Sequence, residues 1–510
     1  MGGLSSRLWF RRGHVAEEPG AVGNVEEVVE AQAAEAQEGE RSEEAQITTS
    51  HGGLKRKANP VGPLAINPRR KYANAKTRSV YEALFLRGEG SDVQIRALGQ
   101  QWNLHRAYLC QSGYFDSMFS GAWREANMNT IELQMADENI DRESFHEVLG
   151  YLYHDTIIIP PNRVIAILAT ASMLQMDELI HQCQEIMKVS VTAQSVCRYY
   201  YSAEIYGLQN IRSICRQWLL DNLMTRCDED LLPEVSVDLM KELIASSDLV
   251  VIEVEMNVYT TLKKWMFLQL EPTWTGPRRA LLSAADLWFA RHRRNSDGAL
   301  FLETDLGRPF VPVFQKLRLP YIICDLPSAH IIDHDALIPA TWLAPVYKKQ
   351  WLALLQAEQS RELGPMEVYA SDLQEYSMRC GGQIHSDEQC SWRWSGFNFG
   401  WDLVVSYTNR RIIFHRSALN KCCGLGVSLL WQRKVAFRLR LISLDTTGRA
   451  ILRKDTNYHM LFLRKDEELE VMNLQEEEVV FPLYVACNFL YLPGEAGDAQ
   501  SEPQGKSSEN

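Results

Sequence analysis

The chain has 510 residues, of which 46% are hydrophobic and 23% charged, the composition of a globular protein of about three domains. Its formal net charge of −12 argues against broad, sequence-independent binding to nucleic acid. No apolar run reaches the roughly 18 residues that a membrane span needs, and the first residues lack the apolar core of a signal peptide. We therefore expect no transmembrane span and an intracellular protein, in which eleven scattered cysteines are reduced thiols.

Residues 1–75 have the pattern of a disordered region. Glu17 to Glu44 contains ten glutamates, one arginine and no aromatic residue, so it cannot bury enough apolar surface to offset its ordering entropy. The opening "MGGLSS" matches an N-myristoylation consensus at Gly2. Two basic clusters about ten residues apart resemble a bipartite nuclear import signal, with solvated linker charge as the alternative: Lys55, Arg56, Lys57, Arg69, Arg70 and Lys71.

From residue 78 the pattern becomes that of a folded protein. "RSVYEALFL" puts Val80 and Leu84 on one helical face, and "SDVQIRAL" and "TIELQM" alternate apolar and polar residues as half-buried strands do. Apolar stripes at helical spacing follow, and from Gln194 to Leu270 the pattern is almost wholly helical.

Beyond about Met378 the pattern changes to short alternating segments. "KVAFRLRLISLD" alternates as a strand does, and "WDLVVSYTNRRIIF" predicts a hairpin with a turn near Thr408-Asn409. The sequence therefore predicts an α+β protein. Its expected parts are a disordered region (1–75), a strand-and-helix domain (78–188), a helical domain (189–290), a mixed connecting region (291–377), a β-rich domain (378–492) and a disordered tail (493–510).

No catalytic motif is present in the sequence. It lacks a phosphate-binding glycine loop, a nucleophile elbow and a paired-histidine metal motif. His105 and Cys110 are five residues apart on a predicted helix and do not share a face well, so we interpret this stretch as packing and not as a catalytic dyad. We expect neither a metal nor a cofactor, because the richest metal-like set lacks the close cysteine spacing of zinc sites: Cys380, His385, Cys390, His415, Cys422 and Cys423.

The stretch from Ser91 to Ile159 resembles the BTB/POZ domain in order, spacing and residue type. That family usually shows Ser-Asp-Val, a hydrophobic-x-x-His-(Lys/Arg) segment, Ser-x-x-Phe-x-x-Met-Phe and a later Tyr-x-Tyr. These motifs stand here at Ser91-Asp92-Val93, His105-Arg106, Ser112 to Phe119 and Tyr151 to Tyr153, with Leu104 where alanine is commoner. The resemblance implies a homodimer, and we expect four residues in its interface: Val80, Leu84, Asp92 and His105.

The helical run "VCRYYYSAEIYGLQNIRSICRQWLLDNL" resembles a BACK domain. A BTB–BACK pair is typical of substrate adaptors of cullin-3 ubiquitin ligases, which often carry a hydrophobic-x-Glu motif. Trp123-Arg124-Glu125 matches that motif, with Trp where Met is frequent. The resemblance implies that Phe119, Trp123 and Glu125 contact cullin-3. No repeat of about 50 residues with paired glycines is present, so Kelch blades are not expected.

The C-terminal part, with "CSWRWSGFNFGWDLVVSYTNRRIIFHR", resembles the germ cell-less family, and we expect this chain to be most similar to its second mammalian paralogue. Aromatic rings beside arginines have the composition of interface hot spots. We therefore expect the C-terminal domain to recruit a protein substrate through Trp392, Trp394, Arg410 and Arg411. Alternation points Trp392 and Trp394 to one face, so the alternative for either ring is a place in the core.

The family resemblance implies a non-enzymatic adaptor in the nucleus, at the nuclear matrix or envelope, with a role in germ-cell development and spermatogenesis. The alternative is a structural or corepressor protein that tethers transcription factors at the nuclear periphery without ubiquitin transfer. Family members are linked to DP-type transcription factors and lamina-associated polypeptides, which keeps this alternative open. Co-purification of cullin-3 distinguishes the two functions.

Overall fold

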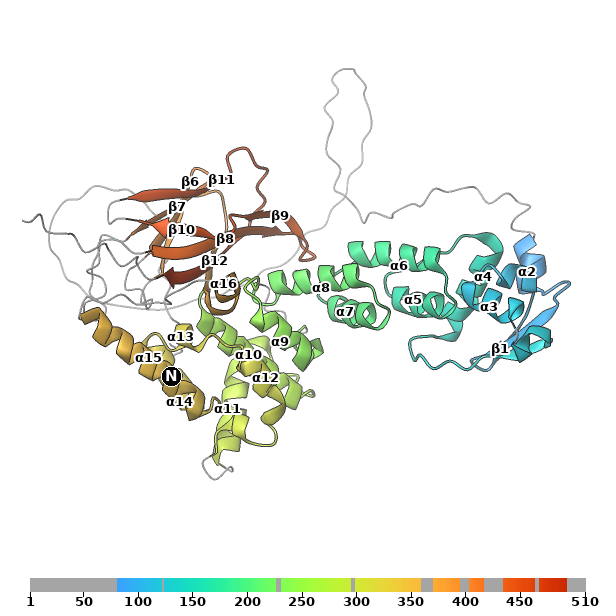
Figure 1. The fold of residues 1–510 in the computed structure, drawn as a ribbon, viewed down its shortest axis with the longest axis horizontal. Coiled ribbons are helices and arrows are strands. Elements are labelled where there is room, and N and C mark those ends of the chain that lie inside the picture. The colour runs from blue at the N-terminus through green and yellow to red at the C-terminus, as the bar shows by residue number, and fades with distance from the viewer. Residues whose placement is uncertain are drawn as a thin grey trace, which may run out of the picture.

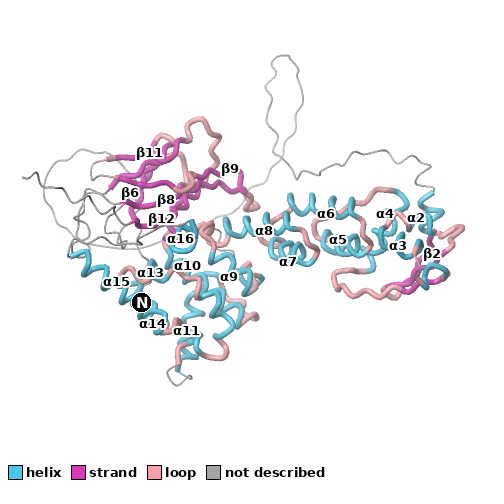
Figure 2. The backbone as a smooth tube through the Cα atoms, in the orientation of Figure 1, coloured by secondary structure: helices cyan, strands magenta, loops and turns pink. Residues whose placement is uncertain are grey.

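The computed structural model describes residues 80–121, 123–225, 231–294, 299–358, 370–394, 403–416, 434–463 and 467–492. The two segments expected to be disordered, with Gly2 and the basic clusters, lie outside these ranges. Figure 1 shows an elongated molecule with a small strand-and-helix unit at one end and a β domain beside a group of helices at the other. The strands fall into two groups, one toward each end (Figure 2).

The N-terminal unit is built on a three-stranded sheet with the order β2-β1-β3, in which β1 is antiparallel to β2 and parallel to β3. Ile95, Leu104 and Ile131 turn into its core, as the alternating pattern predicts. Its elements are η1 Glu82–Leu86, β1 Val93–Ala97, β2 Gln100–Leu104, α2 Arg106–Leu109, α3 Gly113–Ser120, η2 Arg124–Asn127, β3 Thr130–Glu132, α4 Arg142–His154, α5 Val164–Met173 and α6 Asp177–Val189.

The first helix, η1, packs on α4 through aromatic rings. Phe85 is buried, and its ring centroid lies 4.9 Å from that of His146. The indole Nε1 of Trp102 donates a hydrogen bond to His146 Nδ1 at 3.0 Å. Burial lowers the pKa of His146, and the charge of the neighbouring Glu147 opposes that shift. Folding therefore favours the neutral form of the His146 imidazole.

The helical unit continues the same apolar core, which extends from Phe85 to Leu343. Within 291–377, expected as a mixed connecting region, the described residues are mostly helical and bury Phe314 and Ile322 in this core. They belong to the helical unit, whose elements are α7 Val196–Ile205, α8 Gln209–Asn222, η3 Leu232–Glu234, α9 Val237–Ala245, α10 Glu255–Leu270, η4 Arg278–Ala280, α11 Leu281–Arg294, η5 Phe301–Glu303, η6 Arg308–Phe310, α12 Val311–Phe314, α13 Leu319–Ile322, α14 Leu326–Asp335, α15 Ala340–Glu358 and α16 Ala370–Tyr376.

The C-terminal β domain is a sandwich of two sheets. One has the order β10-β8-β12-β4, with β9 also paired to β8, and the other has the order β11-β7-β6-β5. The predicted hairpin is confirmed, because β6 pairs with β7 and the turn residues Asn409 and Arg410 both have positive φ (50° and 58°), as in a type I′ turn. The strands are β4 Met378–Ile384, β5 Cys390–Trp394, β6 Leu403–Thr408, β7 Arg411–Arg416, β8 Lys434–Leu444, β9 Ala450–Asp455, β10 His459–Phe462, β11 Glu468–Asn473 and β12 Leu483–Leu492.

Strand β8 of the larger sheet is buried on both faces. Leu439 and Leu441 point into the sandwich, whereas Arg440 and Ile442 point toward the helical unit. An alternating pattern of this kind is typical of a strand with one solvated face, but here the second face packs against helices. The apolar part of this contact consists of Val250, Ile442, Leu444, Tyr484 and Ala486.

A buried ion pair joins the first strand of the sandwich to the helical unit. Arg379 of β4 donates from Nε and Nη2 to the two carboxylate oxygens of Glu255, the first residue of α10, at 2.8 and 2.9 Å. Its Nη1 donates to the carbonyl oxygens of Ile244 and Ser246 at 2.8 and 2.9 Å. Both charged side chains are at most 1% exposed. The pair therefore has its partners inside the protein and not in water.

We predict that Arg379→Leu lowers the free energy of unfolding of the full chain by about 3–5 kcal/mol, because it leaves the Glu255 carboxylate buried without its cation. Urea denaturation followed by circular dichroism measures this loss. Arg308→Leu is the matched control, since the Arg308–Asp305 pair is largely exposed, and little change is expected there. Equal effects of the two substitutions would contradict this role of Arg379.

We also predict that acid destabilises the N-terminal unit through His146. A histidine with a lowered folded pKa contributes its full stability above the unfolded pKa of about 6.5 and loses it as the pH falls through that value toward the folded pKa. The free energy of unfolding should fall as the pH drops from about 7.5 through about 6.5 and below, and less steeply in His146→Gln. His181→Gln is the control, because that side chain is 71% exposed. The same pH slope in all three proteins would refute the assignment.

Candidate functional site

The surface formed by α3 and η2 brings together the three residues expected to contact cullin-3. The Ser112 hydroxyl donates to the Leu174 carbonyl at 2.5 Å and holds the start of α3, whose Phe115 is buried. Phe119 on the same helix is half-buried, and Trp123, just before η2, is 55% exposed. An exposed tryptophan of this kind is the residue type that most often anchors a protein partner.

Arg106 positions this surface, although the sequence analysis assigned it no role. Its guanidinium lies over the Phe119 ring, 4.7 Å from the centroid. Nη2 donates to the Met128 carbonyl at 2.7 Å, and Nη1 donates to the Ala126 carbonyl. One cation thus connects α3 to the end of η2. The signal was present in the His105-Arg106 motif, but only the folded chain shows which groups the arginine contacts.

Glu125 lies in η2 and is half-exposed. Burial raises the pKa of the Tyr114 hydroxyl, and the Glu125 charge raises it further. Met128, 49% exposed, extends the same apolar surface. The arrangement is an aromatic and apolar surface with one carboxylate at its edge. Such a composition suits protein recognition.

Asp92 and His105, expected in a dimer interface, form bonds within their own domain. Asp92 Oδ1 accepts from the Arg106 backbone nitrogen at 2.9 Å. His105 Nε2 lies 3.0 Å from the Glu89 carbonyl, and Nδ1 lies 3.2 Å from the Tyr153 hydroxyl. These contacts hold the start of α2. Their place in an interface between two chains stays a prediction.

His105 and Cys110, interpreted from the sequence as packing residues, have separate surroundings in the structure. Both ring nitrogens of His105 lie within hydrogen-bond distance of Glu89 and Tyr153. Burial, followed by the charge of Asp116, raises the pKa of the Cys110 thiol, which is opposite to the lowered pKa of a nucleophilic cysteine. Within the described ranges, no group of three or more metal-ligating side chains could hold an ion.

The predicted substrate residues are not all on the surface. Trp392 is 2% exposed and lies in the core of the sandwich, where a side chain on Gly382 would approach within 2.7 Å of its ring. Its assignment as a direct surface contact is therefore wrong, because the strand turns it inward. Arg410 and Arg411 are about 40% exposed and form ion pairs with Asp387 and Glu470 at 2.8 and 3.3 Å. The Trp394 side chain lies outside the described residues.

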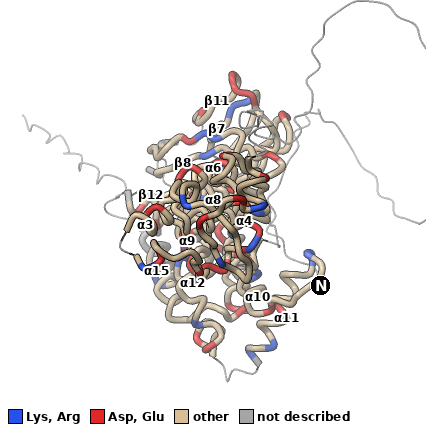
Figure 3. The backbone as a smooth tube through the Cα atoms, turned by 90° about the vertical axis from the view of Figure 1, so that its right-hand side faces the viewer, with Lys and Arg blue, Asp and Glu red and all other residues tan. Residues whose placement is uncertain are grey.

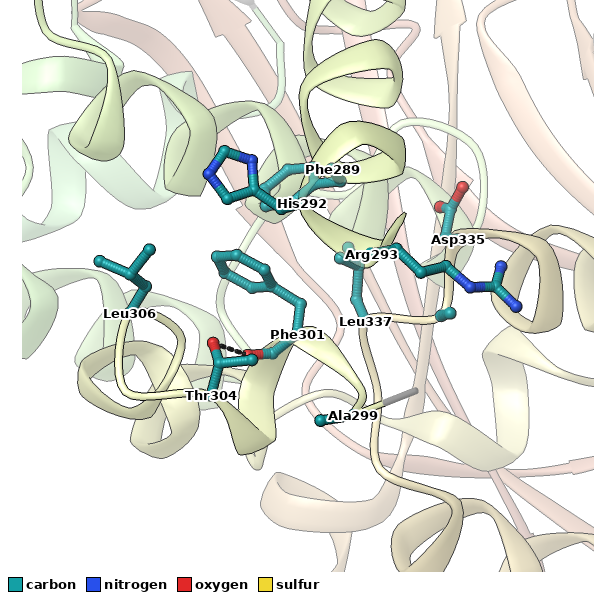
Figure 4. A pocket seen from close by; sticks show the side chains of 10 residues that line it. Phe289, His292, Arg293, Ala299, Phe301, Thr304, Leu306, Asp335 and Leu337 are labelled. Atoms are coloured by element: carbon teal, nitrogen blue, oxygen red, sulfur yellow. Dashed lines mark hydrogen bonds between the residues drawn. The ribbon is translucent and has the colours of Figure 1, made fainter. Parts of the chain in front are cut away.

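A cavity of about 200 Å³ lies in the helical unit beside α11 (Figure 4). Its walls include Phe289 and Phe301, and His292 contributes an imidazole. Asp335 at its edge accepts from Lys263 at 2.6 Å, so this carboxylate is already paired. None of the predicted site residues lines the cavity.

Acidic and basic residues are interspersed over the molecule in the view of Figure 3. The ion pair between Lys454 and Glu477, at 2.7 Å, is one example of this mixing. The pattern agrees with protein recognition better than with binding to a nucleic acid backbone. In the part of the chain that the structure describes, every helix is too short or too polar to cross a bilayer.

Comparison with known proteins identifies two domains. Residues 81–191 match the BTB/POZ domain family, which we placed at 78–188, and residues 196–276 match the BACK family, "BTB And C-terminal Kelch", which we placed within 189–290. The BTB match contains the complete surface of α3 and η2 described above.

Relatives match most of the chain. It is 53% identical over 428 residues to mouse germ cell-less protein-like 1, covering 84% of this chain and 82% of that protein. It is 52% identical over 435 residues to human germ cell-less protein-like 2, covering 85% and 83%. It is 32% identical over 457 residues to the Drosophila protein germ cell-less, covering 85% and 80%.

The identities to the two paralogues are nearly equal, so assignment to the second one stays a prediction. The matches extend well beyond the BTB and BACK domains, which end at residue 276, and thus include the C-terminal part of the chain. The chain belongs to the germ cell-less family of BTB–BACK proteins.

Proposed function

We propose that this protein is a non-catalytic substrate adaptor of a cullin-3 ubiquitin ligase, acting in germ-cell development and spermatogenesis. The observation that carries the proposal is the exposed Trp123, four residues after Phe119, whose ring is held by Arg106 in a BTB domain. A large ring that the protein does not cover, next to a rigidly held aromatic residue, is how a binding hot spot is built. Glu125 would orient the partner through its charge.

The protein acts in this proposal as a homodimer. Thr156 to Pro160 pairs with no strand of the described sheets, and Ile158 within it is 87% exposed. Val80, just before η1, and Leu86, its last residue, are 40% and 55% exposed. Exposed apolar side chains of this kind gain by contact with a second chain.

The β domain recruits the protein substrate in this proposal. We keep two arginines in the proposed recruiting surface: Arg410, in the turn between β6 and β7, and Arg411, at the start of β7. Trp392 is not part of it, because its side chain is buried. Deleting residues 378–492 is a poor test of substrate recruitment. The deletion would also remove Arg379, the partner of Glu255, and expose the apolar residues of the helical unit that pack against the sheet. Substitutions at Arg410 and Arg411 test recruitment without that damage.

A nuclear location, at the matrix or envelope, is part of the proposal and rests on the basic clusters at Lys55 to Lys57 and Arg69 to Lys71. A tether that binds DP-type transcription factors or lamina-associated polypeptide without ubiquitin transfer would share this location. Such a tether would not bind cullin-3 through the α3–η2 surface. Cullin-3 binding therefore decides between the two.

We predict that Trp123→Ala and Glu125→Ala each weaken binding of the full chain to cullin-3 by about 2 kcal/mol, or roughly thirtyfold. Trp351→Ala is the matched control, because Trp351 on α15 is equally exposed, at 58%, and lies in the helical unit. Isothermal titration with the cullin-3 N-terminal region measures the affinities. Parent-like binding by both variants would remove the ligase assignment and favour the tether.

We predict an obligate dimer in solution, with an interface above roughly 2,000 Å². Val80→Asp should convert it toward monomer, because it places a charge in the apolar contact expected around Val80 and Leu84. Leu287→Asp on α11 is the control, since Leu287 is 61% exposed and lies in another unit. Analytical ultracentrifugation at micromolar concentration reports the state, and a monomeric parent protein would disprove the dimer.

A further inference from the structure

The contact between the β domain and the helical unit contains two buried arginines besides the apolar patch. Arg440 of β8 is 3% exposed, and its guanidinium donates to the carbonyl oxygens of Ser247 and Asp248 at 3.0 and 2.6 Å. Asn488 of β12 donates to the same Ser247 carbonyl at 3.1 Å. With the Arg379–Glu255 pair, these bonds hold the connection between α9 and α10 against the outer face of the sheet.

A second contact lies at α8, next to the α9–α10 connection, whose Val250 nitrogen donates to the Leu220 carbonyl of α8 at 3.0 Å. Asn222 Nδ2 donates to the Gly448 carbonyl, in the turn between β8 and β9, at 2.8 Å. Arg453 of β9 forms an ion pair with the buried Asp221. Gly448 has φ +87°, and a side chain there would come within 2.4 Å of Asn222 Oδ1 and 2.6 Å of Trp218. Only glycine lets this turn approach α8 so closely.

The two contacts restrict movement of the β domain more than either does alone. Rotation about the α9–α10 connection would pull the β8–β9 turn away from Asn222, and rotation about that turn would break the bonds of Arg440. An apolar patch alone tolerates sliding, whereas guanidinium-to-carbonyl bonds are directional and fit one register. Helix α8 in turn packs on α6 of the N-terminal unit. A continuous packed path therefore leads from the BTB domain to the β domain.

We propose that the helical unit and the β domain form one rigid body, and that Gly448 and Arg440 are positioning residues that, with the Arg379–Glu255 pair, set the orientation of the β domain relative to the BTB domain. The functional consequence rests on the adaptor function proposed above. A protein recruited by the β domain is held in a fixed direction from the surface of Phe119 and Trp123. Ubiquitin transfer then depends on this orientation as well as on capture.

The test compares Gly448→Ala with Gly207→Ala. Gly207 also has a left-handed φ, +70°, but a side chain there meets nothing within 4 Å, so it carries the same backbone strain without the clash. Spin labels on noncanonical residues replace His181 on α6 and Glu468 on β11, both exposed. Pulsed EPR measures their distance in the full chain, diluted with unlabelled chain so that distances between chains vanish.

We expect one narrow distance distribution in the parent and in Gly207→Ala, and a shifted or broadened one in Gly448→Ala. A broad distribution in the parent would overturn the fixed orientation of the β domain relative to the BTB domain, and an unchanged one in Gly448→Ala would overturn the role of Gly448. Arg440→Met, which removes the bonds to Ser247 and Asp248 but keeps the side-chain length, is the second variant if Gly448→Ala does not fold.

The functional arm uses cells that express each variant fused to a proximity-labelling enzyme. Gly448→Ala should label the same partners as Gly207→Ala and bind cullin-3 as tightly, while ubiquitination of those partners falls several-fold. Equal ubiquitination by the two variants would overturn the dependence on orientation. Absence of ubiquitination with the parent would instead refute the adaptor function and leave the distance measurements as an independent test of the rigid body.

Discussion

The buried pair of Arg379 and Glu255 is the interaction on which the arrangement of the whole C-terminal half depends. Glu255 begins α10, which lies in the main apolar core, and Arg379 lies in the first strand of the sandwich. Removing both charges from water is costly, and the bidentate geometry with two further carbonyl acceptors offsets that cost only when β4 sits in one place. The pair therefore selects one docking position more than it adds stability.

The larger sheet also has no solvated face over β8. Its inner face packs in the sandwich, and its outer face meets the α9–α10 connection through Arg440 and Ile442. Arg318 shows how strongly this region excludes water, since burial, with the nearby charge of Arg379, lowers its pKa to about 9. Its donors are satisfied by the carbonyl oxygens of Ser377 and Gln374, just before β4. The start of the sandwich is thus held by helices on several sides.

At the other end of the molecule, one arginine connects several elements as Arg379 does in the C-terminal half. Arg106 contacts the Phe119 ring and the carbonyl oxygens that end η2, and its backbone nitrogen binds Asp92. It joins the sheet, α3 and η2 into one surface from which Trp123 projects. A binding surface presented on a rigid support loses less entropy on association than a mobile one. This supports recognition of a protein partner at this end. It agrees with the proposal that the BTB domain binds cullin-3 and the β domain binds the substrate.

The sequence by itself determined the BTB, BACK and β-rich parts, their order and most element types. The hairpin at Asn409 and the inward turn of Ile95 and Ile131 follow from local alternation and turn chemistry. Periodicity reports which residues share a face, but it does not report what that face packs against. Alternation already allowed Trp392 to be core, and the structure buries it. Only the tertiary structure decided that Arg440 meets helices and that the described residues within 291–377 belong to the helical unit, because both depend on contacts between segments far apart in the chain.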